Sequence, residues 1–312
     1  MPANLFLMIL LFLIPLIMAA QAPVVQPALV NPSTSKEIAF VSDTQAPMWI
    51  ENVFLKANQN QRATRLIFED IVKTKPRAAY ILGDVVALGY RNSKWKNMDK
   101  CIQQCRESGV DVYAVLGNHD VMSRAKKGEL NFQKRFPEHV RTGYVSVMDS
   151  VAVVLVNSNF SKLTTEDINH QQAWYEETVI KLDKDPAVKA VIVTCHHAPY
   201  TNSKIVGSSK AVQDHFVPAF QKSNKSVLFI TGHSHNFEHF KKSGKHFLVI
   251  GGGGGLHQPI GTNLEDISTN YKPMFHYLTV LREKNNLLII SHFLKDDFSG
   301  VEKQYSFSAA IP

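Results

Sequence analysis

The chain has 312 residues, of which 45% are hydrophobic and 20% charged, with 16 glycines and 14 prolines. This composition excludes a disordered or collagen-like chain and predicts a folded domain with a full core. The net charge of +7 suits an anionic partner, but it does not choose among nucleic acid, lipid and phosphorylated metabolite. With only Cys101, Cys105 and Cys195, the chain cannot form a disulfide scaffold or a four-thiolate zinc site.

The first 22 residues differ most in composition from the rest of the chain. An apolar run from Leu5 to Met18 is followed by small residues up to Ala22, which predicts a signal peptide over residues 1–22. The run is shorter than the roughly 20 residues of a membrane-spanning helix, so we expect no transmembrane anchor after signal removal. A periplasmic or secreted location follows. The proline-rich residues 23–36 are typical of a flexible linker.

The remaining residues, 37–312, are predicted to form one domain of the α/β class. Short β-branched runs alternate with longer amphipathic runs, the pattern of a sheet covered by helices. Buried strands are predicted at residues 38–42, 78–82, 110–116, 151–157, 188–195 and 227–231. Helices are predicted at residues 62–73, 93–107, 166–182 and 210–221. After residue 236 the helical pattern fades, and three runs are expected to close a second sheet, at residues 247–250, 275–281 and 287–294.

Residues that can bind metal ions follow five of these strands, either directly or after one glycine. In chain order they are Asp43, Asp84, the run Asn118, His119 and Asp120, the pair His196 and His197, and finally His233 and His235. Because loops at the carboxyl ends of the strands of an α/β sheet converge on one crevice, we expect these side chains to meet. Carboxylates, an amide and imidazoles together suit Mn, Fe or Zn better than Ca or Mg.

The chain resembles the calcineurin-like metallophosphoesterase superfamily through an ordered series of motifs. They are Asp43-x-Gln45, Gly83-Asp84, Gly117-Asn118-His119-Asp120, His196-His197-x-Pro199 and Gly232-His233-x-His235. A lone Gly-Asp pair says little, whereas Gly-Asn-His-Asp followed much later by Gly-His-x-His is highly specific. The resemblance covers residues 37 to about 295 and is greatest to a bacterial branch related to purple acid phosphatases. It implies the metallo-dependent phosphatase fold, a four-layer α-β-β-α sandwich of two mixed β-sheets flanked by helices.

The resemblance also implies a centre of two divalent metal ions, Mn, Fe or Zn, and no flavin, nicotinamide or haem. In that centre Asp84 bridges the two ions. The further ligands are Asp43, His235 and Gln45 for the first ion, and Asn118, His196 and His233 for the second. His197 is an alternative to His196, because it matches the shorter His-x-Pro form of the motif.

The implied activity is hydrolysis of a phosphate ester, with monoesters favoured over diesters, by attack of a hydroxide that bridges the two ions. His119 is then the proton donor to the leaving oxygen, and Asp120 orients its ring. The expected partner is a small phosphorylated substrate. The sequence has no clear nucleic-acid-binding module and leaves the oligomeric state open. A non-catalytic metal- or phosphate-binding scaffold and a nuclease are the alternatives.

Three positions depart from the family pattern, and one of them is Ala198, where the family often has the first Pro of His-His-Pro-Pro. Gln45 stands where the family has the His of Asp-x-His. A neutral amide oxygen is a weaker ligand than imidazole. Either Gln45 still coordinates the ion, or it only hydrogen-bonds and the first site is looser. Ala87 stands three residues after Asp84, where purple acid phosphatases carry a Tyr, which predicts a divalent centre without purple colour.

Residues near the motifs are candidates for contact with substrate. Tyr200 and Asn202 follow the histidine pair, and His257 follows the glycine run Gly251–Gly255. The glycine run is expected to let the backbone approach the site closely. Substrate choice is expected to depend on the loops at residues 124–135, 200–210 and 257–272.

Overall fold

The computed structural model of the chain describes residues 24–25, 33–270 and 272–312. The predicted signal peptide lies outside these residues, as does most of the predicted linker. Two described parts of the linker contact the domain: Val24 and Val25 pair with β5 (Tyr144–Met148), and the backbone N–H of Ser33 donates to the carbonyl of Gly109. Over the described residues, no helix combines the length and apolarity needed to cross a membrane.

The described strands form two sheets. The first has the order β1 (Val24–Val25), β5 (Tyr144–Met148), β6 (Val151–Leu155), β7 (Ala190–Thr194), β8 (Ser226–Thr231), β10 (Lys245–Ile250) and β9 (Phe237–Lys242). The second has the order β13 (Val301–Ala310), β12 (Asn286–Leu294), β11 (His276–Arg282), β2 (Glu37–Val41), β3 (Ala78–Leu82) and β4 (Asp111–Val115). Both are mixed. The strands β6, β7, β8 and β10 are parallel in the middle of the first sheet, whereas β2, β3 and β4 are parallel at one edge of the second.

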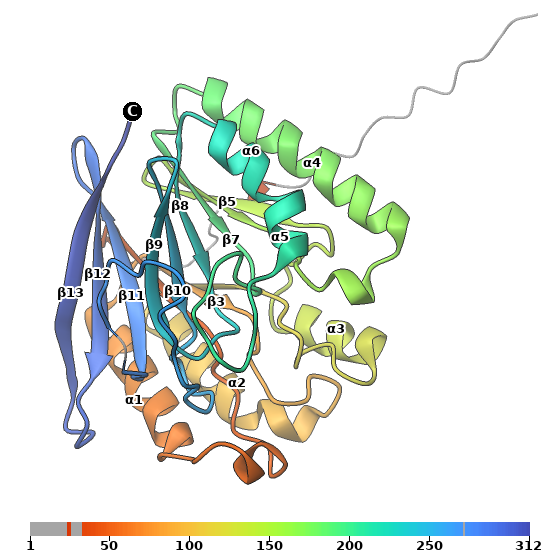
Figure 1. Cartoon of the computed structure of the whole chain (residues 1–312), viewed down its shortest axis with the longest axis vertical. Coiled ribbons are helices and arrows are strands. Elements are labelled where there is room, and N and C mark those ends of the chain that lie inside the picture. The colour runs from red at the N-terminus through yellow and green to blue at the C-terminus, as the bar shows by residue number, and fades with distance from the viewer. Residues whose placement is uncertain (1–23, 26–32, 271) are drawn as a thin grey trace, which may run out of the picture.

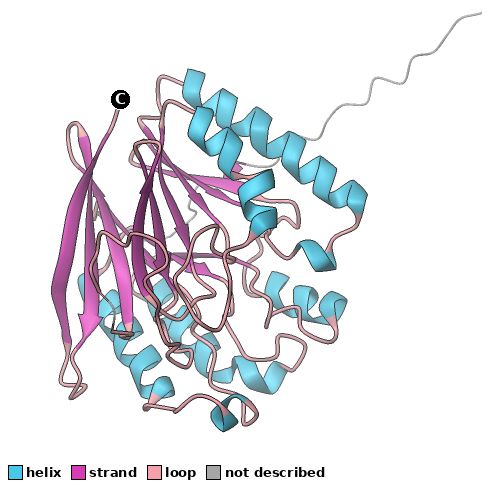
Figure 2. Ribbon diagram, viewed as in Figure 1, coloured by secondary structure: helices cyan, strands magenta, loops and turns pink. Residues whose placement is uncertain are grey.

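Helices cover the outer face of each sheet (Figures 1 and 2). One group consists of α1 (Asn60–Thr74), α2 (Asn92–Glu107) and α3 (Ala125–Gln133), which pack on the second sheet. The other consists of α4 (Thr165–Lys184), α5 (Lys210–His215) and α6 (Val217–Lys222), which pack on the first. This arrangement confirms the predicted four-layer α-β-β-α sandwich.

A single apolar layer joins the two sheets. From the second sheet it contains the stacked rings of Phe40, Tyr80 and Tyr113, with centroids 5.0 and 5.3 Å apart. Ile192 and Leu228 face them from the first sheet. The central strands are buried on both faces, which is why their sequences are continuous apolar runs with no alternation of polar residues.

The structure corrects three of the sequence predictions for secondary structure. The helix expected at 210–221 is two short helices that meet at Phe216, because Pro218 lacks an N–H and cannot continue a helix that began at Lys210. The late strands do not all join the second sheet, since β10 pairs with β8 in the first. The loop expected at 124–135 contains α3. The strands β5, β9 and β13 were not predicted.

Candidate metal centre

Five strands deliver the predicted ligands to one place. The strands β2, β3 and β4 are parallel neighbours in one sheet, β7 and β8 are parallel neighbours in the other, and the motifs follow their carboxyl ends. Gly83 lets these loops close on each other, because a Cβ there would lie 2.7 Å from both the Gly117 nitrogen and Nδ1 of His196. The centre is therefore shared between the two sheets.

One part of the centre gathers around the ring of His196, which is fully buried. Its Nε2 lies 3.3 Å from Oδ2 of Asp84, 3.1 Å from Oδ1 of Asn118 and 3.2 Å from Nδ1 of His233. Its Nδ1 lies 2.9 Å from the carbonyl of Leu82, so Nδ1 carries the hydrogen and a neutral ring turns the Nε2 lone pair toward the other ligands. These are the four residues predicted for the second ion.

The charges around His196 favour a cation at this position. Burial by itself lowers the pKa of His196, but the Asp84 and Asp43 carboxylates outweigh burial and raise it to about 9. Burial by itself raises the pKa of Asp84, but His196 and His119 hold it well below its usual range. The carboxylates around His196 therefore favour a positive charge at this position.

The other part of the centre lies between Asp43 and His235. Nε2 of His235 lies 3.5 Å from Oδ1 of Asp43, and its Nδ1 lies 2.5 Å from the carbonyl of Leu256. Oδ2 of Asp43 accepts a hydrogen bond from the backbone N–H of His233, at 2.9 Å. Oδ1 of Asp43 is buried and has no hydrogen-bond partner, as expected of an atom that binds an ion.

Gln45 lies beside these two residues and is buried. Its amide nitrogen faces the carbonyls of Asp43 and Asp84, at 3.1 and 3.0 Å, because only this orientation satisfies both donors and acceptors. The amide oxygen then faces Nε2 of His235, with the two atoms 3.4 Å apart. Gln45 therefore holds the two aspartate loops together and turns its oxygen toward the first predicted site.

These observations fit a pair of divalent ions. The described residues contain two groups of three potential ligands, and within each group the ligand atoms lie within 4.8 Å of one another. One group is Asp43, Asp84 and His196, and the other is His196, His197 and His233. The donors are oxygen and nitrogen atoms, which suit first-row transition metals. The unpartnered oxygen of Asp43 and the carboxylates around His196 both favour a positive charge here.

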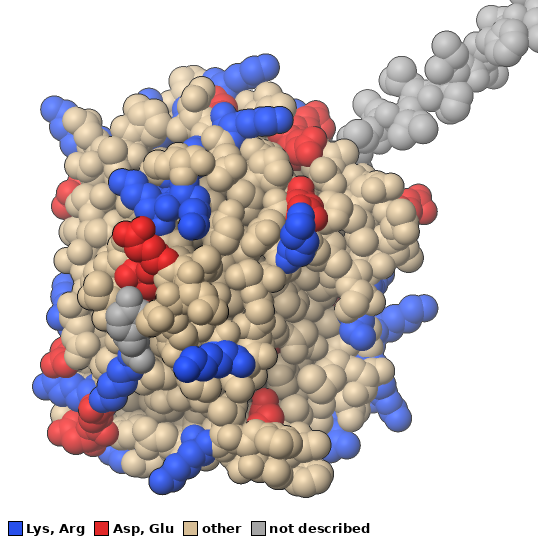
Figure 3. All heavy atoms as spheres, in the orientation of Figure 1, with Lys and Arg blue, Asp and Glu red and all other residues tan. Residues whose placement is uncertain are grey.

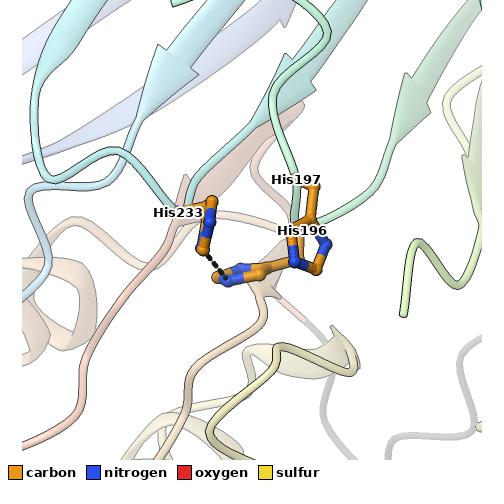
Figure 4. A group of neighbouring side chains, drawn as sticks. All are labelled: His196, His197 and His233. Atoms are coloured by element: carbon orange, nitrogen blue, oxygen red, sulfur yellow. Dashed lines mark hydrogen bonds between the residues drawn. The ribbon is translucent and has the colours of Figure 1, made fainter. Parts of the chain in front are cut away.

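His197 lies next to this group (Figure 4). Its ring centroid is 4.5 Å from that of His233, and its Nδ1 lies 2.9 Å from Oγ of Ser158. Burial and the neighbouring His196 lower its pKa to about 3, so the ring is neutral. His196 has the contacts with Asp84 and Asn118 that a shared ligand set needs, whereas His197 is held from the side by Ser158.

His119 lines the cavity above the ligands. Its Nδ1 lies 3.2 Å from the carbonyl of Ala87, and its Nε2 lies 3.9 Å from carboxylate oxygens of both Glu51 and Asp84. The backbone N–H of His119 donates to Oδ1 of Asp84 at 2.7 Å, which fixes the position of both residues. Nδ1 is anchored and Nε2 faces the cavity, as a proton donor requires.

Asp120 does not orient the His119 ring, contrary to the sequence prediction. Its carboxylate accepts hydrogen bonds from the backbone N–H groups of Val85, Val86 and Gly117. Burial and the nearby Asp84 raise its pKa to about 7. The carbonyl of Ala87 is the group that contacts the His119 ring, and Asp120 instead holds the loop that carries Asp84.

The three candidate substrate contacts do not line the cavity. The ring of Tyr200 packs against Phe247, with centroids 5.0 Å apart. The side-chain amide of Asn202 exchanges two hydrogen bonds with the backbone of Leu264. His257 packs on Phe275, with ring centroids 4.2 Å apart, and burial lowers its pKa to about 4. The sequence showed proximity along the chain but not the direction in which these side chains point.

The glycine run confirms the expected close approach. The N–H of Gly253 donates to the carbonyl of Ser42 and that of Gly255 to the carbonyl of Asp43. A Cβ on Gly255 would lie 2.5 Å from Cε1 of His235.

The cavity above the ligands has a volume of about 430 Å³. Three residues that line it, Ile205, Val206 and Gln258, lie in two of the loops expected to determine substrate choice. Three others, Glu51, Phe54 and Leu55, were not found from the sequence. Glu51 belongs to a short 3₁₀ turn (Glu51–Val53) without a motif, so only the fold reveals it. No sequence pattern marked the apolar residues as part of the cavity lining, because isolated apolar residues are common in loops.

Comparison with known proteins decides the family. A sequence model of the calcineurin-like phosphoesterases matches residues 36–237, more than half of the chain. The chain belongs to this family. The predicted superfamily is confirmed, and so is the predicted class of enzyme, a metal-dependent phosphoric ester hydrolase. The assignment to a bacterial branch stays a prediction. No curated protein sequence matches the chain significantly.

Solved structures share the fold at low sequence identity. A purple acid phosphatase from yellow lupin seeds has a TM-score of 0.65 and 17% identity, over 91% of this chain and 56% of that one. A dimetal phosphatase from Danio rerio has a TM-score of 0.58 and 12% identity, over 88% and 99%. The anchor of the inner membrane complex of Plasmodium has a TM-score of 0.63 and 15% identity, over 88% and 89%. The chain thus spans little more than half the length of the lupin protein.

Proposed function

We propose that this calcineurin-like phosphoesterase binds two divalent metal ions and hydrolyses phosphate esters, monoesters in preference to diesters, outside the cytoplasm. The main support is the convergence of Asp43, Asp84, Asn118, His196, His233 and His235 on one buried centre. The likeness in fold to a purple acid phosphatase supports the monoester preference. The apolar run at residues 5–18 supports export.

Two ions held by these residues would supply a reactive water and would neutralise charge on the phosphoryl oxygens. The chain supplies the rest of the reaction. Asp84 carries a charge that keeps two like-charged ions together, and its position is held by the His119 N–H. When protonated, the His119 ring donates Nδ1–H to Ala87 and presents Nε2–H to the cavity, where the leaving oxygen takes up the proton.

Metal removal and replacement test this proposal. The purified protein should lose hydrolysis of monoesters in a chelator and regain it with Mn, Zn or Fe, at two ions per chain. Hydrolysis that is indifferent to the chelator would contradict it. Monoesters and diesters assayed side by side with each metal test the preference.

The role of His119 has its own test. His119→Ala should retain two ions and lose rate mainly on substrates whose leaving groups are poor, because a good leaving group needs no proton. An equal loss on aryl and alkyl phosphates would argue against a proton donor.

A non-catalytic scaffold is a second candidate. It is supported by Gln45, which stands where the family has an imidazole, and by the fold shared with a Plasmodium protein that is described as an anchor. Metal analysis separates the two functions, since a scaffold needs no second ion.

A further inference from the structure

The cavity above the metal centre has two chemically different parts. Its floor consists of the polar residues Asp84, Asn118, His119, His233 and His235. Its rim consists largely of apolar residues, namely Phe54, Leu55, Ile205 and Val206. None of the described residues that line it is Lys or Arg, and the rim carries the carboxylate of Glu51. A substrate whose phosphoryl group reaches the floor must place its remaining atoms along the rim.

The rim exposes apolar side chains to an unusual degree. Phe54 is 83% exposed and Ile205 is 54% exposed. Within the described residues the large exposed apolar side chains number eight. Five of them lie in the two rim segments, residues 48–55 and 201–206, at Trp49, Ile50, Val53, Phe54 and Ile205, and of these Phe54 and Ile205 line the cavity. Scattered exposed apolar residues are normal, but a concentration at the mouth of a functional cavity marks a binding surface.

Both rim segments are held in place. Oε2 of Glu51 accepts a hydrogen bond from the N–H of Met48, and the Leu55 N–H donates to the Glu51 carbonyl. The loop that carries Ile205 is tied down by Glu238, whose buried carboxylate accepts hydrogen bonds from Thr201 and from the Asn202 N–H. Glu238 thus ties the segment of Ile205 to the rest of the fold, and the bonds of Glu51 fix the local shape of residues 48–55.

We infer that the rim binds the leaving group of the substrate and selects an apolar one, so that the substrates are alkyl or aryl esters that carry a single phosphate. This inference rests on the proposed function. Contact with Phe54 and Ile205 removes apolar surface from water on both sides, which favours longer chains. The Glu51 carboxylate and the absence of cations from the described lining disfavour substrates with a second phosphate.

Binding of a ligand that cannot be hydrolysed tests the rim without turnover. n-Alkylphosphonates from methyl to octyl keep the phosphoryl head group but have a C–P bond. When these phosphonates are titrated into protein loaded with Zn, their affinity should rise about twofold per methylene. This corresponds to roughly half the free energy gained when a methylene is completely buried. An affinity that does not change with chain length would overturn the inference. The n-alkyl phosphates, whose longer primary alcohols have nearly equal acidity, should show the same trend in kcat/KM.

Matched variants assign the effect to the rim. Ile205→Ser with Phe54→Ser should flatten the dependence of phosphonate affinity on chain length. Ile180→Ser is the control, because Ile180 on α4 is also 54% exposed but does not line the cavity. An equal effect of the control and rim variants would overturn the inference.

Other results separate this inference from the proposed function. If phosphonate affinity rises with chain length but the protein hydrolyses no ester, the proposed function is wrong and the inferred apolar binding surface is supported. Hydrolysis that is independent of chain length would keep the function and reject the rim. Binding to phosphatidylcholine vesicles, without preference for longer phosphonates, would assign the rim to a lipid surface and reject it as a leaving-group site.

Discussion

Replacing Gly255 with alanine should damage one half of the metal centre. The new methyl carbon would lie 2.5 Å from Cε1 of His235, whereas carbon atoms normally stay about 3.5 Å apart, so the ring must move by about 1 Å. The ring cannot yield easily, because its Nδ1 is held 2.5 Å from the carbonyl of Leu256. Metal sites tolerate only about 0.2 Å of error in a ligand distance. We expect the ion next to Asp43 and His235 to bind on the order of a hundredfold more weakly.

The assay is metal stoichiometry and affinity, measured by calorimetry with Zn and by elemental analysis after dialysis. The variant should retain one ion near His196 and lose the other. Gly300→Ala is the matched control, because a Cβ there meets no atom within 4 Å. If Gly255→Ala binds two ions with unchanged affinity and hydrolyses monoesters at the normal rate, the reasoning that places His235 in the metal centre is wrong.

Three further predictions concern the centre and the stability of the fold. Asp84→Asn should reduce phosphate-ester hydrolysis on the order of a hundredfold or more, measured as kcat/KM at saturating Mn. The reason is that the neutral side chain of Asn no longer holds two ions together. Activity near normal would contradict a bridging role for Asp84. Gln45→Ala should weaken the binding of one ion about tenfold or more and leave the binding of the other unchanged. A Zn titration should then show one tightly and one weakly bound ion in place of two tightly bound ions. Two ions bound with unchanged affinity would show that Gln45 is not a ligand. The third concerns His239 and His246, whose Nε2 and Nδ1 lie 2.8 Å apart and whose pKa values are lowered to about 3 and about 4 by burial, with nearby cations adding to it. These rings take up a proton near pH 6.5 in the unfolded chain but not in the folded chain. With EDTA present, the free energy of unfolding should therefore fall between pH 7 and pH 5. The fall should be about 2 kcal/mol for the buried His239 and less for His246. Urea unfolding of a His239→Gln, His246→Gln variant should show a smaller fall than the wild type, and an equal fall would contradict the prediction.

The sequence by itself predicted the family, the sandwich fold and a set of candidate metal ligands. It did so because each ligand follows a buried strand, and a strand of continuous apolar residues such as Ala78–Leu82 is recognisable without a structure. Once the strands are known, parallel pairing of β2 and β3 brings Asp43 and Asp84 to the same end of one sheet. The packing of the two sheets then brings His196 to them. The sequence could not show β13, because most of its side chains are exposed or half-buried and its pattern lacks a strong apolar signal.

Only the tertiary structure decided what surrounds the ligands. Asp120 lies next to His119 in the sequence, yet it binds backbone N–H groups of the loop after β3, and Ala87 contacts the ring instead. Phe54 and Ile205 are far apart in the sequence and carry no motif, but they line the same cavity. The physical reason is that a ligand set is specified by residue type at strand ends, whereas a binding surface arises from loops whose paths depend on long-range contacts such as those of Glu238.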